Sequence, residues 1–188
     1  LATRAADARV SPSGAAIFCT TMSVIRLIEG PVGAGKSTFA THLASQEGGV
    51  HIALDRWFAT LFSPDRPETG FMPWYTERKE RCIDVIWGVT RSLMASNIDA
   101  ILELGLIQRQ SREAFYRRVE ADGFQLAVYL LDAPLEVRRE RVRERNGLRG
   151  NTFSMIVPDR IFEIASRLWE PPDDTERLER RITVVSAD

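Results

Sequence analysis

Runs of apolar residues alternate along the chain with segments in which apolar positions recur every three or four residues. The apolar runs predict strands at 24–29, 50–54, 99–105, 124–132 and 181–185. The helical spacing predicts helices at 36–46, 56–62, 75–95, 109–121, 134–145 and 156–169. Glycine and proline predict loops at 63–74 and 146–153. Because apolar strands separated by helices are typical of a parallel sheet covered on both faces, the chain is predicted to form a single doubly wound α/β domain of about five strands.

Composition narrows the class of protein. The 188 residues suffice for one domain, and the formal net charge of −1 argues against a broad nucleic-acid surface without excluding a local basic patch. The two cysteines, Cys19 and Cys82, offer no zinc-ligand spacing, and we expect a reduced, cytoplasmic protein. No apolar run approaches the ~20 residues of a membrane span. Residues 1–22 are small and polar, so we expect a disordered extension followed by one domain at 23–188.

The segment GPVGAGKST, residues 30–38, concentrates glycine between a predicted strand and a predicted helix. It fits the pattern G-x-x-x-x-G-K-[ST], in which glycine lets backbone N–H groups crowd around an anion at a helix N-terminus. A merely flexible turn is the alternative interpretation. We expect a bound nucleoside triphosphate, with Lys36 on the β- and γ-phosphates and the Ser37 hydroxyl on Mg²⁺. The expected binding residues are Gly30, Gly33, Ala34, Gly35, Lys36, Ser37 and Thr38.

Two carboxylates lie at the carboxyl ends of predicted strands, where ligands bind in open α/β sheets. Asp55, in LDRWF, could accept the proton of a hydroxyl that attacks the γ-phosphate. The alternative role is a helix N-cap for a segment beginning at Arg56. Glu103, in ILELG, resembles the acidic residue of a Walker-B motif. Asp is usual at that position, and Glu is longer by one methylene group. Glu103 would hold Mg²⁺ through a water or contact the substrate, unless it is simply a buried hydrogen-bonding carboxylate.

The segment DAPLEVRRERVRERNGLRGN, residues 132–151, contains six arginines. A solvated helix face accounts for several of them through pairing with the glutamates Glu136, Glu140 and Glu144. Arg141 and Arg145 lie four residues apart on one face, next to the following loop, and could close over a triphosphate to neutralise the charge of the transferred phosphoryl group. Arg149 is a weaker third candidate. We therefore expect Arg145 to contact ATP as well.

In these segments the chain resembles the P-loop kinases that include polynucleotide 5′-hydroxyl kinases, zeta-type toxins and chloramphenicol phosphotransferase. The likeness follows GPVGAGKST, LDRWF, ILELG and LLDAPLEVRRERVRERN in that order and extends over residues 23–188. It implies a P-loop NTPase fold with an arginine-rich lid, and ATP-dependent phosphorylation of a hydroxyl. Asp55 matches the catalytic base, Arg141 and Arg145 match the lid arginines, and Arg112 matches a position that binds the acceptor or a phosphate. Glu103 departs from the usual Asp, which leaves direct metal ligation in doubt.

The acceptor is expected to bind at 57–78, with Trp57 and Glu103 among its contacts. Aromatic side chains there could stack on a sugar-like acceptor, or could only pack a small subdomain over the sheet. The carboxylates Asp65, Glu68 and Glu77 would favour a cationic acceptor such as an aminocyclitol antibiotic. The expected reaction is transfer of the ATP γ-phosphate to a small-molecule hydroxyl, on a nucleotide sugar, an antibiotic or another metabolite. A nucleic-acid 5′-hydroxyl, nucleoside or nucleotide kinase is one alternative, and an ATP-binding regulatory module without an acceptor is another.

Overall fold

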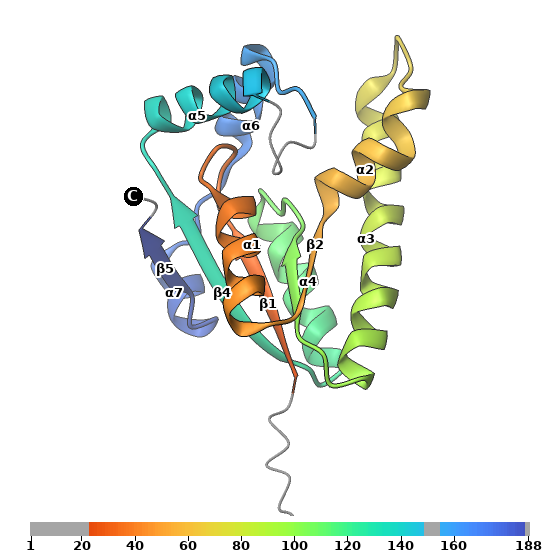
Figure 1. Ribbon diagram of the computed structural model, residues 1–188, viewed down its shortest axis with the longest axis vertical. Coiled ribbons are helices and arrows are strands. Elements are labelled where there is room, and N and C mark those ends of the chain that lie inside the picture. Colours follow the sequence, from red (N-terminus) through yellow and green to blue (C-terminus); the bar gives the residue numbers. More distant parts are fainter. Residues whose placement is uncertain (1–22, 149–154, 187–188) are drawn as a thin grey trace, which may run out of the picture.

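The computed structural model describes residues 23–148 and 155–186. The expected N-terminal extension and Arg149 lie outside the described residues. Five strands form one parallel sheet in the order β2-β3-β1-β4-β5 (Figure 1). Their bounds are β1 Val24–Glu29, β2 Val50–Ala53, β3 Ala100–Glu103, β4 Gln125–Asp132 and β5 Thr183–Ser186. The predicted α/β domain with five parallel strands is confirmed.

Helices cover both faces of the sheet, as Figure 1 shows. Helix α1 (Lys36–Glu47) covers one face, and α3 (Phe71–Ala95) and α4 (Arg109–Ala121) cover the other. Successive strand residues point to opposite faces, so Leu27 packs among residues of α3 and α4 while its neighbour Ile28 packs with Ala40 and Leu43 of α1. The strands are therefore buried on both sides, which explains their continuous apolar runs.

The remaining elements differ from the prediction mainly at their ends. They are α2 (Leu54–Phe62), the 3₁₀ helix η1 (Ser63–Asp65), α5 (Leu135–Leu148), α6 (Asp159–Leu168) and α7 (Asp174–Glu179). Helix α3 begins at Phe71 within the predicted proline-rich loop, because Pro73 lies in its first turn, where a backbone N–H has no helical partner to lose. Helix α5 continues to Leu148 through part of the predicted loop at 146–153.

Helix α7 was not predicted. It is short, and the side chain of its N-cap, Asp173, accepts a hydrogen bond of 2.8 Å from the backbone N–H of Glu176.

Because all five strands are parallel, their carboxyl ends share one edge of the sheet, and the loops after β1, β2 and β3 meet there. In the ranges 23–148 and 155–186, no helix has both the length and the apolar character needed to cross a bilayer.

Candidate active site

The loop after β1 follows a path that depends on glycine. Gly30 and Gly33 adopt φ angles of 144° and 81°, which side-chain-bearing residues rarely adopt. A Cβ at Gly30 would overlap the carbonyl oxygen of Leu131 in β4, and one at Gly33 would lie 2.5 Å from the carbonyl oxygen of Arg138 in α5. Strand β4 and helix α5 therefore press directly on the backbone of this loop.

The loop and helix α5 together line a cavity of about 300 Å³. It includes most of the residues expected to bind a nucleotide: Gly33, Gly35, Lys36, Ser37 and Thr38. Gly30 and the buried Ala34 are absent from this lining. Lys36, the first residue of α1, donates hydrogen bonds of 2.9 Å to the carbonyl oxygens of Gly30 and Pro31. An ammonium group and a helix N-terminus at one cavity favour an anionic ligand.

Glu103 lies at the end of β3 and lines the same cavity. The Ser37 hydroxyl donates a hydrogen bond of 2.9 Å to its Oε1. The His51 Nε2 lies 3.4 Å from the other oxygen, Oε2, but does not meet hydrogen-bond geometry, so Oε2 is a buried atom without a hydrogen-bond partner in the described part of the chain. Burial acts to raise the pKa of Glu103, but the contact with His51, the charge of Lys36 and the Ser37 hydrogen bond hold it below its usual value.

The ionised carboxylate of Glu103, whose Oε2 makes no hydrogen bond to a described residue, and the neighbouring hydroxyl of Ser37 are a suitable pair of ligands for Mg²⁺. They could bind the ion directly or through a water molecule. The described residues contain no group of three or more His, Cys, Asp or Glu side chains that could hold a metal ion by themselves. A Mg²⁺ at Ser37 and Glu103 would therefore take its other ligands from phosphates and water, as Mg²⁺ commonly does.

Asp55 lies in the first turn of α2, immediately after the end of β2. The N-cap of α2 is Ala53, and no side chain caps this helix, so the alternative interpretation of Asp55 as an N-cap is wrong. Asp55 retains substantial contact with solvent although protein atoms surround it. The effect of burial on its pKa is therefore smaller than it would be for a fully enclosed carboxyl group.

Strand pairing places Asp55 near Glu103. Ala53 of β2 lies opposite Glu103 of β3, and Asp55 follows Ala53 by two residues at the same edge of the sheet. Burial raises the pKa of Asp55 above its usual value and the charge of Glu103 adds to this effect, whereas the cations of Lys36, Lys79 and Arg145 oppose it. Asp55 itself is not among the residues that line the cavity.

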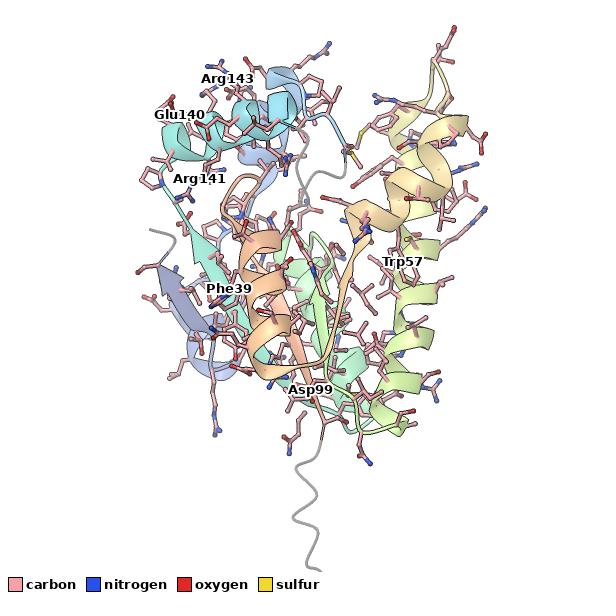
Figure 2. All side chains as sticks on the ribbon, viewed as in Figure 1. Phe39, Trp57, Asp99, Glu140, Arg141 and Arg143 are labelled. Carbon is pink, nitrogen blue, oxygen red and sulfur yellow. The ribbon has the colours of Figure 1, made fainter. Side chains whose placement is uncertain are left out.

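Helix α5 turns two of its arginines toward the cavity. Arg141 and Arg145 both line it, as expected from their spacing. Figure 2 shows Arg141 on the side of α5 that faces the glycine loop, with Glu140 and Arg143 on the outer side. The Arg145 Nε is buried and makes no hydrogen bond to any described residue, so it is available for a ligand.

The solvated-face interpretation applies to other arginines of α5, although their partners lie largely on α6. Arg139 forms an ion pair with Glu163 of α6 and another with Glu136 on its own helix. Arg143 pairs with Asp159 at 2.7 Å. The ion pairs with Glu163 and Asp159 join α5 to α6 and so support the helix that carries Arg141 and Arg145.

Arg138 has a structural role that the sequence did not reveal. Its side chain is buried, and its Nη1 donates hydrogen bonds to the Val32 carbonyl oxygen at 3.1 Å and to the Ser166 hydroxyl at 3.2 Å, while its Nε donates to Ala133 at 3.0 Å. It therefore fastens the glycine loop to α5 and α6. Its only sequence signal is the helical spacing that it shares with the buried Val142.

Two further charged residues, Glu29 and Lys79, were not predicted as part of the site. Glu29, the last residue of β1, is 2% exposed, its Oε1 has no hydrogen-bond partner among the described residues, and burial raises its pKa to about 8. Lys79 of α3 donates a hydrogen bond of 2.9 Å to the carbonyl oxygen of Gly105. The available signals were a carboxylate at the end of an apolar strand and a lysine at helical spacing from the buried Cys82 and Ile86.

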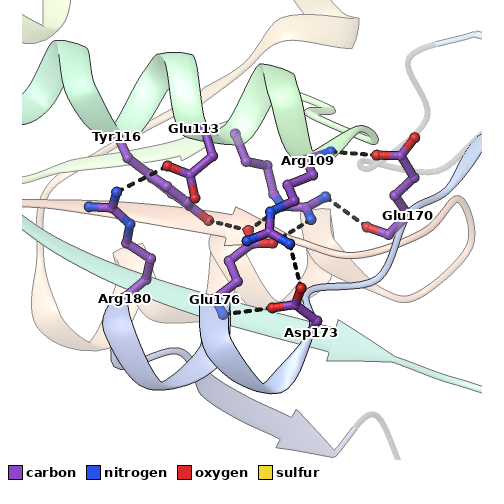
Figure 3. A network of polar contacts seen from close by, with 8 residues as sticks. Arg109, Glu113, Tyr116, Glu170, Asp173, Glu176 and Arg180 are labelled. Atoms are coloured by element: carbon purple, nitrogen blue, oxygen red, sulfur yellow. Dashed lines mark hydrogen bonds and ion pairs between the residues drawn. The ribbon is translucent and has the colours of Figure 1, made fainter.

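Arg112 does not reach the cavity. Its side chain is fully buried, its Nε and Nη2 donate to the two carboxylate oxygens of Glu176 at 2.6 and 2.8 Å, and its Nη1 donates to the carbonyl oxygen of Glu170 at 2.8 Å. The Tyr116 hydroxyl also donates a hydrogen bond of 3.3 Å to Glu176 Oε1. Figure 3 shows Tyr116 and Glu176 pointing toward each other in this network. This network joins α4 to α7, and it does not support the expected contact between Arg112 and an acceptor.

The aromatic residues of 57–78 pack mainly against one another and the core. The ring of Phe58 lies 5.0–5.7 Å from those of Phe62, Trp74 and Tyr75, and Trp57 packs against the core between α3 and the sheet. This favours the interpretation of a small packed subdomain.

The carboxylates that would favour a cationic acceptor do not gather at the cavity. Asp65 and Glu68 are exposed, Glu77 pairs with Arg81, and none of these carboxylates lines the cavity.

Solved structures share this fold at low sequence identity. Kti12 of Chaetomium thermophilum, in complex with ADP-AlF3, has a TM-score of 0.63 at 16% identity, with 87% of this chain and 89% of that chain covered. A gluconokinase of Sinorhizobium meliloti 1021 has a TM-score of 0.52 at 20% identity, with 88% and 83% covered. A chain of the Pnkp1/Rnl/Hen1 RNA repair complex has a TM-score of 0.60 at 18% identity, and the match covers 78% of this chain but only 44% of that one.

No curated protein is similar enough in sequence to count as a match. The family model AAA_33, described as an AAA domain, matches residues 25–168. That range contains the glycine loop, Asp55, Glu103 and the arginines of α5, and the predicted likeness to small P-loop kinases is confirmed at the level of family and fold. The chain belongs to the AAA_33 family of AAA domains.

Proposed function

We propose that this protein transfers the γ-phosphate of ATP to a hydroxyl group of a small-molecule acceptor. The observation that carries the proposal is the position of Asp55, an exposed carboxylate two residues after Ala53, which pairs with Glu103 of the neighbouring strand. Glu103 lines the cavity between the glycine loop and helix α5 together with Lys36 and Arg145, and the charges of these three residues act on Asp55. A general base must lie beside the γ-phosphate, within reach of the hydroxyl proton that it accepts.

Each residue has a chemical role in this reaction. The backbone of the glycine loop and Lys36 bind the β- and γ-phosphates, while Ser37 and Glu103 hold Mg²⁺, which supplies positive charge to the phosphate oxygens when bound. The acceptor O–H bond breaks as its proton moves to Asp55, the acceptor oxygen forms a bond to the γ-phosphorus, and the bond from that phosphorus to the bridging oxygen breaks to leave ADP. Arg141 and Arg145 stabilise the charge on the phosphoryl oxygens during transfer.

The region beside Asp55 favours a small acceptor over a polynucleotide. A nucleic-acid groove would require cations that are free to contact phosphates. In 57–78, however, Arg66 stacks over the Phe71 ring at 4.3 Å and Arg78 stacks over the Trp74 ring at 4.8 Å. Two of the cations in this segment are therefore committed to aromatic contacts.

The test uses Asp55→Asn, with Asp65→Asn as the matched control because Asp65 is exposed on the neighbouring η1. The substrates are ATP with Mg²⁺ and a panel of sugars, hydroxy acids, aminocyclitols, nucleosides and a 5′-hydroxyl oligonucleotide. We expect Asp55→Asn to bind ATP normally but to lose acceptor-dependent ADP release by about 10²–10⁴-fold, while Asp65→Asn stays at the wild-type rate.

Two results would refute the proposal. Phosphoryl transfer that survives in Asp55→Asn would remove the base from the mechanism. Tight ATP binding by the wild-type protein without acceptor-dependent ADP release across the panel would favour a regulatory nucleotide-binding module. Transfer to the oligonucleotide alone would keep the chemistry and replace the small acceptor by a nucleic-acid end.

A further inference from the structure

The last turn of helix α5 supplies part of the cavity wall. Arg145 and Leu148 both line the cavity, and α5 ends at Leu148. The last four carbonyl groups of a helix have no partner within it, and helix ends fray. Gly147 weakens this turn further, because glycine is among the least favourable residues inside a helix. The place of the Arg145 guanidinium therefore depends on a contact that keeps the last turn helical.

The side chain of Asn146 ties this turn to the segment that leads into α6. Its Nδ2 donates a hydrogen bond of 2.8 Å to the carbonyl oxygen of Val157, and its Oδ1 accepts one of 3.1 Å from the backbone N–H of the same residue. Both hydrogen bonds are partly buried, so water competes with them less than on an open surface. The dipeptide Asn-Gly is typical of turns, yet the helix continues through it to Leu148. The contact with Val157 explains why the turn stays helical.

Helices α5 and α6 form an antiparallel hairpin. Three further contacts join them, with partners that run backward along α6 as α5 runs forward: Arg138 with Ser166, Arg139 with Glu163 and Arg143 with Asp159. The side chains of Arg143 and Asp159 are 59% and 56% exposed, and exposed ion pairs contribute little to stability. Among the contacts of the described residues, the one between Asn146 and Val157 lies farthest along α5, in the turn that carries Arg145.

The hairpin leaves Arg145 directed at the cavity. Consecutive helix residues point about 100° apart, so Asn146 can face Val157 while Arg145 faces the cavity. The Arg145 Nε is buried and makes no hydrogen bond to a described residue. The backbone of the last turn, which Asn146 fixes, therefore largely determines where this guanidinium lies.

We propose that Asn146 is a positioning residue for Arg145: its two hydrogen bonds to the backbone of Val157 keep the last turn of α5 helical and the guanidinium of Arg145 in the phosphate cavity. This inference rests on the proposed function. An arginine that is already in place stabilises the charge on the phosphoryl oxygens without reorganisation at the moment of transfer. Asn146 does not line the cavity and acts only through Arg145.

The first experiment compares kcat at saturating Mg²⁺–ATP and acceptor in Asn146→Ala and in Asn146→Ala combined with Gly147→Ala. We expect the single variant to lose about tenfold, the effect of removing roughly two hydrogen bonds. Gly147→Ala favours the helix, and its added Cβ has no described atom within 4 Å, so the double variant should regain most of the rate. Arg143→Gln, which breaks the exposed ion pair of the same hairpin, is the control and should change kcat by less than about twofold.

The same exchange in an Arg145→Ala background tests whether Asn146 acts through Arg145. We expect Asn146→Ala to lower kcat there by less than about twofold, because the group that it positions is gone. An unchanged kcat in Asn146→Ala alone would overturn the proposal. So would an equal loss in both backgrounds, or a loss that Gly147→Ala does not relieve.

The second experiment needs no acceptor. Nitrogen-15 relaxation reports the order of the Arg145 Nε–H bond, with Arg145→Ala to identify the signal, and hydrogen exchange reports the opening of the amides of Gly147 and Leu148. In Asn146→Ala we expect the order parameter to fall below about 0.6 and these amides to exchange about tenfold faster, and adding Gly147→Ala should reverse both changes.

These measurements separate the inference from the proposed function. If no acceptor is ever phosphorylated but Arg145 loses order in Asn146→Ala, the proposed function fails while the positioning of Arg145 by Asn146 stands. An Arg145 side chain that is equally ordered in the wild type and in Asn146→Ala contradicts the role of Asn146 whatever the activity.

Discussion

Glu29 should make the stability of this protein depend on pH, and the exchange Glu29→Gln should remove that dependence. The side chain lies at the end of β1, directly before the glycine loop, and is almost completely buried. Burial raises its pKa from an ordinary value of 4.5 to about 8, against the opposing charges of Arg112, Lys36 and Lys79. Glutamine has nearly the same shape and no proton to lose.

The sign and size of the effect follow from this pKa. Between pH 4.5 and about 8 the folded protein holds a proton on Glu29 that the unfolded chain has released. The stability contributed by Glu29 is therefore complete below pH 4.5 and is lost as the pH rises to about 8. Each pH unit in this window corresponds to about 1.4 kcal/mol, so the ceiling over the whole window is about 5 kcal/mol.

Urea unfolding of the wild type and of Glu29→Gln at several pH values between about 5 and 8 measures this effect. The difference in the free energy of unfolding, variant minus wild type, should increase by about 1.4 kcal/mol per pH unit and level off above about pH 8. Glu80→Gln, at an exposed position of α3, serves as the control for loss of a carboxyl group. A difference that does not change with pH would show that Glu29 is ionised in the folded protein and would refute the reasoning.

Two further predictions concern the buried ion pair and the glycine loop. Arg112→Met leaves Glu176 buried without its cation, so the free energy of unfolding should fall by about 3–5 kcal/mol in urea titrations, and adding Glu176→Met should restore most of it; a double variant as unstable as the single one would contradict this. Gly33→Ala places a Cβ 2.5 Å from the carbonyl oxygen of Arg138 at a φ of 81°. ATP affinity measured by calorimetry should fall by at least about tenfold, and wild-type affinity in this variant would count against a rigid loop. The helical Gly88→Ala, with no atom within 4 Å of the added Cβ, is its control.

The parts of the site that the sequence predicted depend on local rules. The glycine spacing, the preceding strand and the following helix define the loop at 30–38 without reference to the rest of the chain. Asp55 and Glu103 lie at the carboxyl ends of strands of a parallel sheet, and this topology brings such ends to one edge. Arg141 and Arg145 share a helix face through their spacing alone. Four separate segments therefore could be placed at one site before any contact was known.

The parts that could not be predicted depend on contacts between distant segments. Arg112 and Glu176 are 64 residues apart, and only the packing of α7 on α4 reveals that this arginine is buried and already paired. Glu29 and Arg138 likewise have charged side chains whose burial follows from the tertiary structure. The early start of α3 at Phe71 was missed because a proline in the first turn of a helix has the same sequence signal as a proline in a loop.

The contact between Gly33 and Arg138 has a consequence for dividing the polypeptide into fragments. The entire nucleotide-binding motif occurs within the first 38 residues, but the wall that shapes it comes from a helix that starts at Leu135. A fragment that stops after β4 would contain the motif without the carbonyl group and the guanidinium of Arg138, which confine its backbone. Split-protein designs or truncations should therefore keep α5 on the same piece as α1, because separating them would dismantle the phosphate cradle even where each piece retains its own secondary structure.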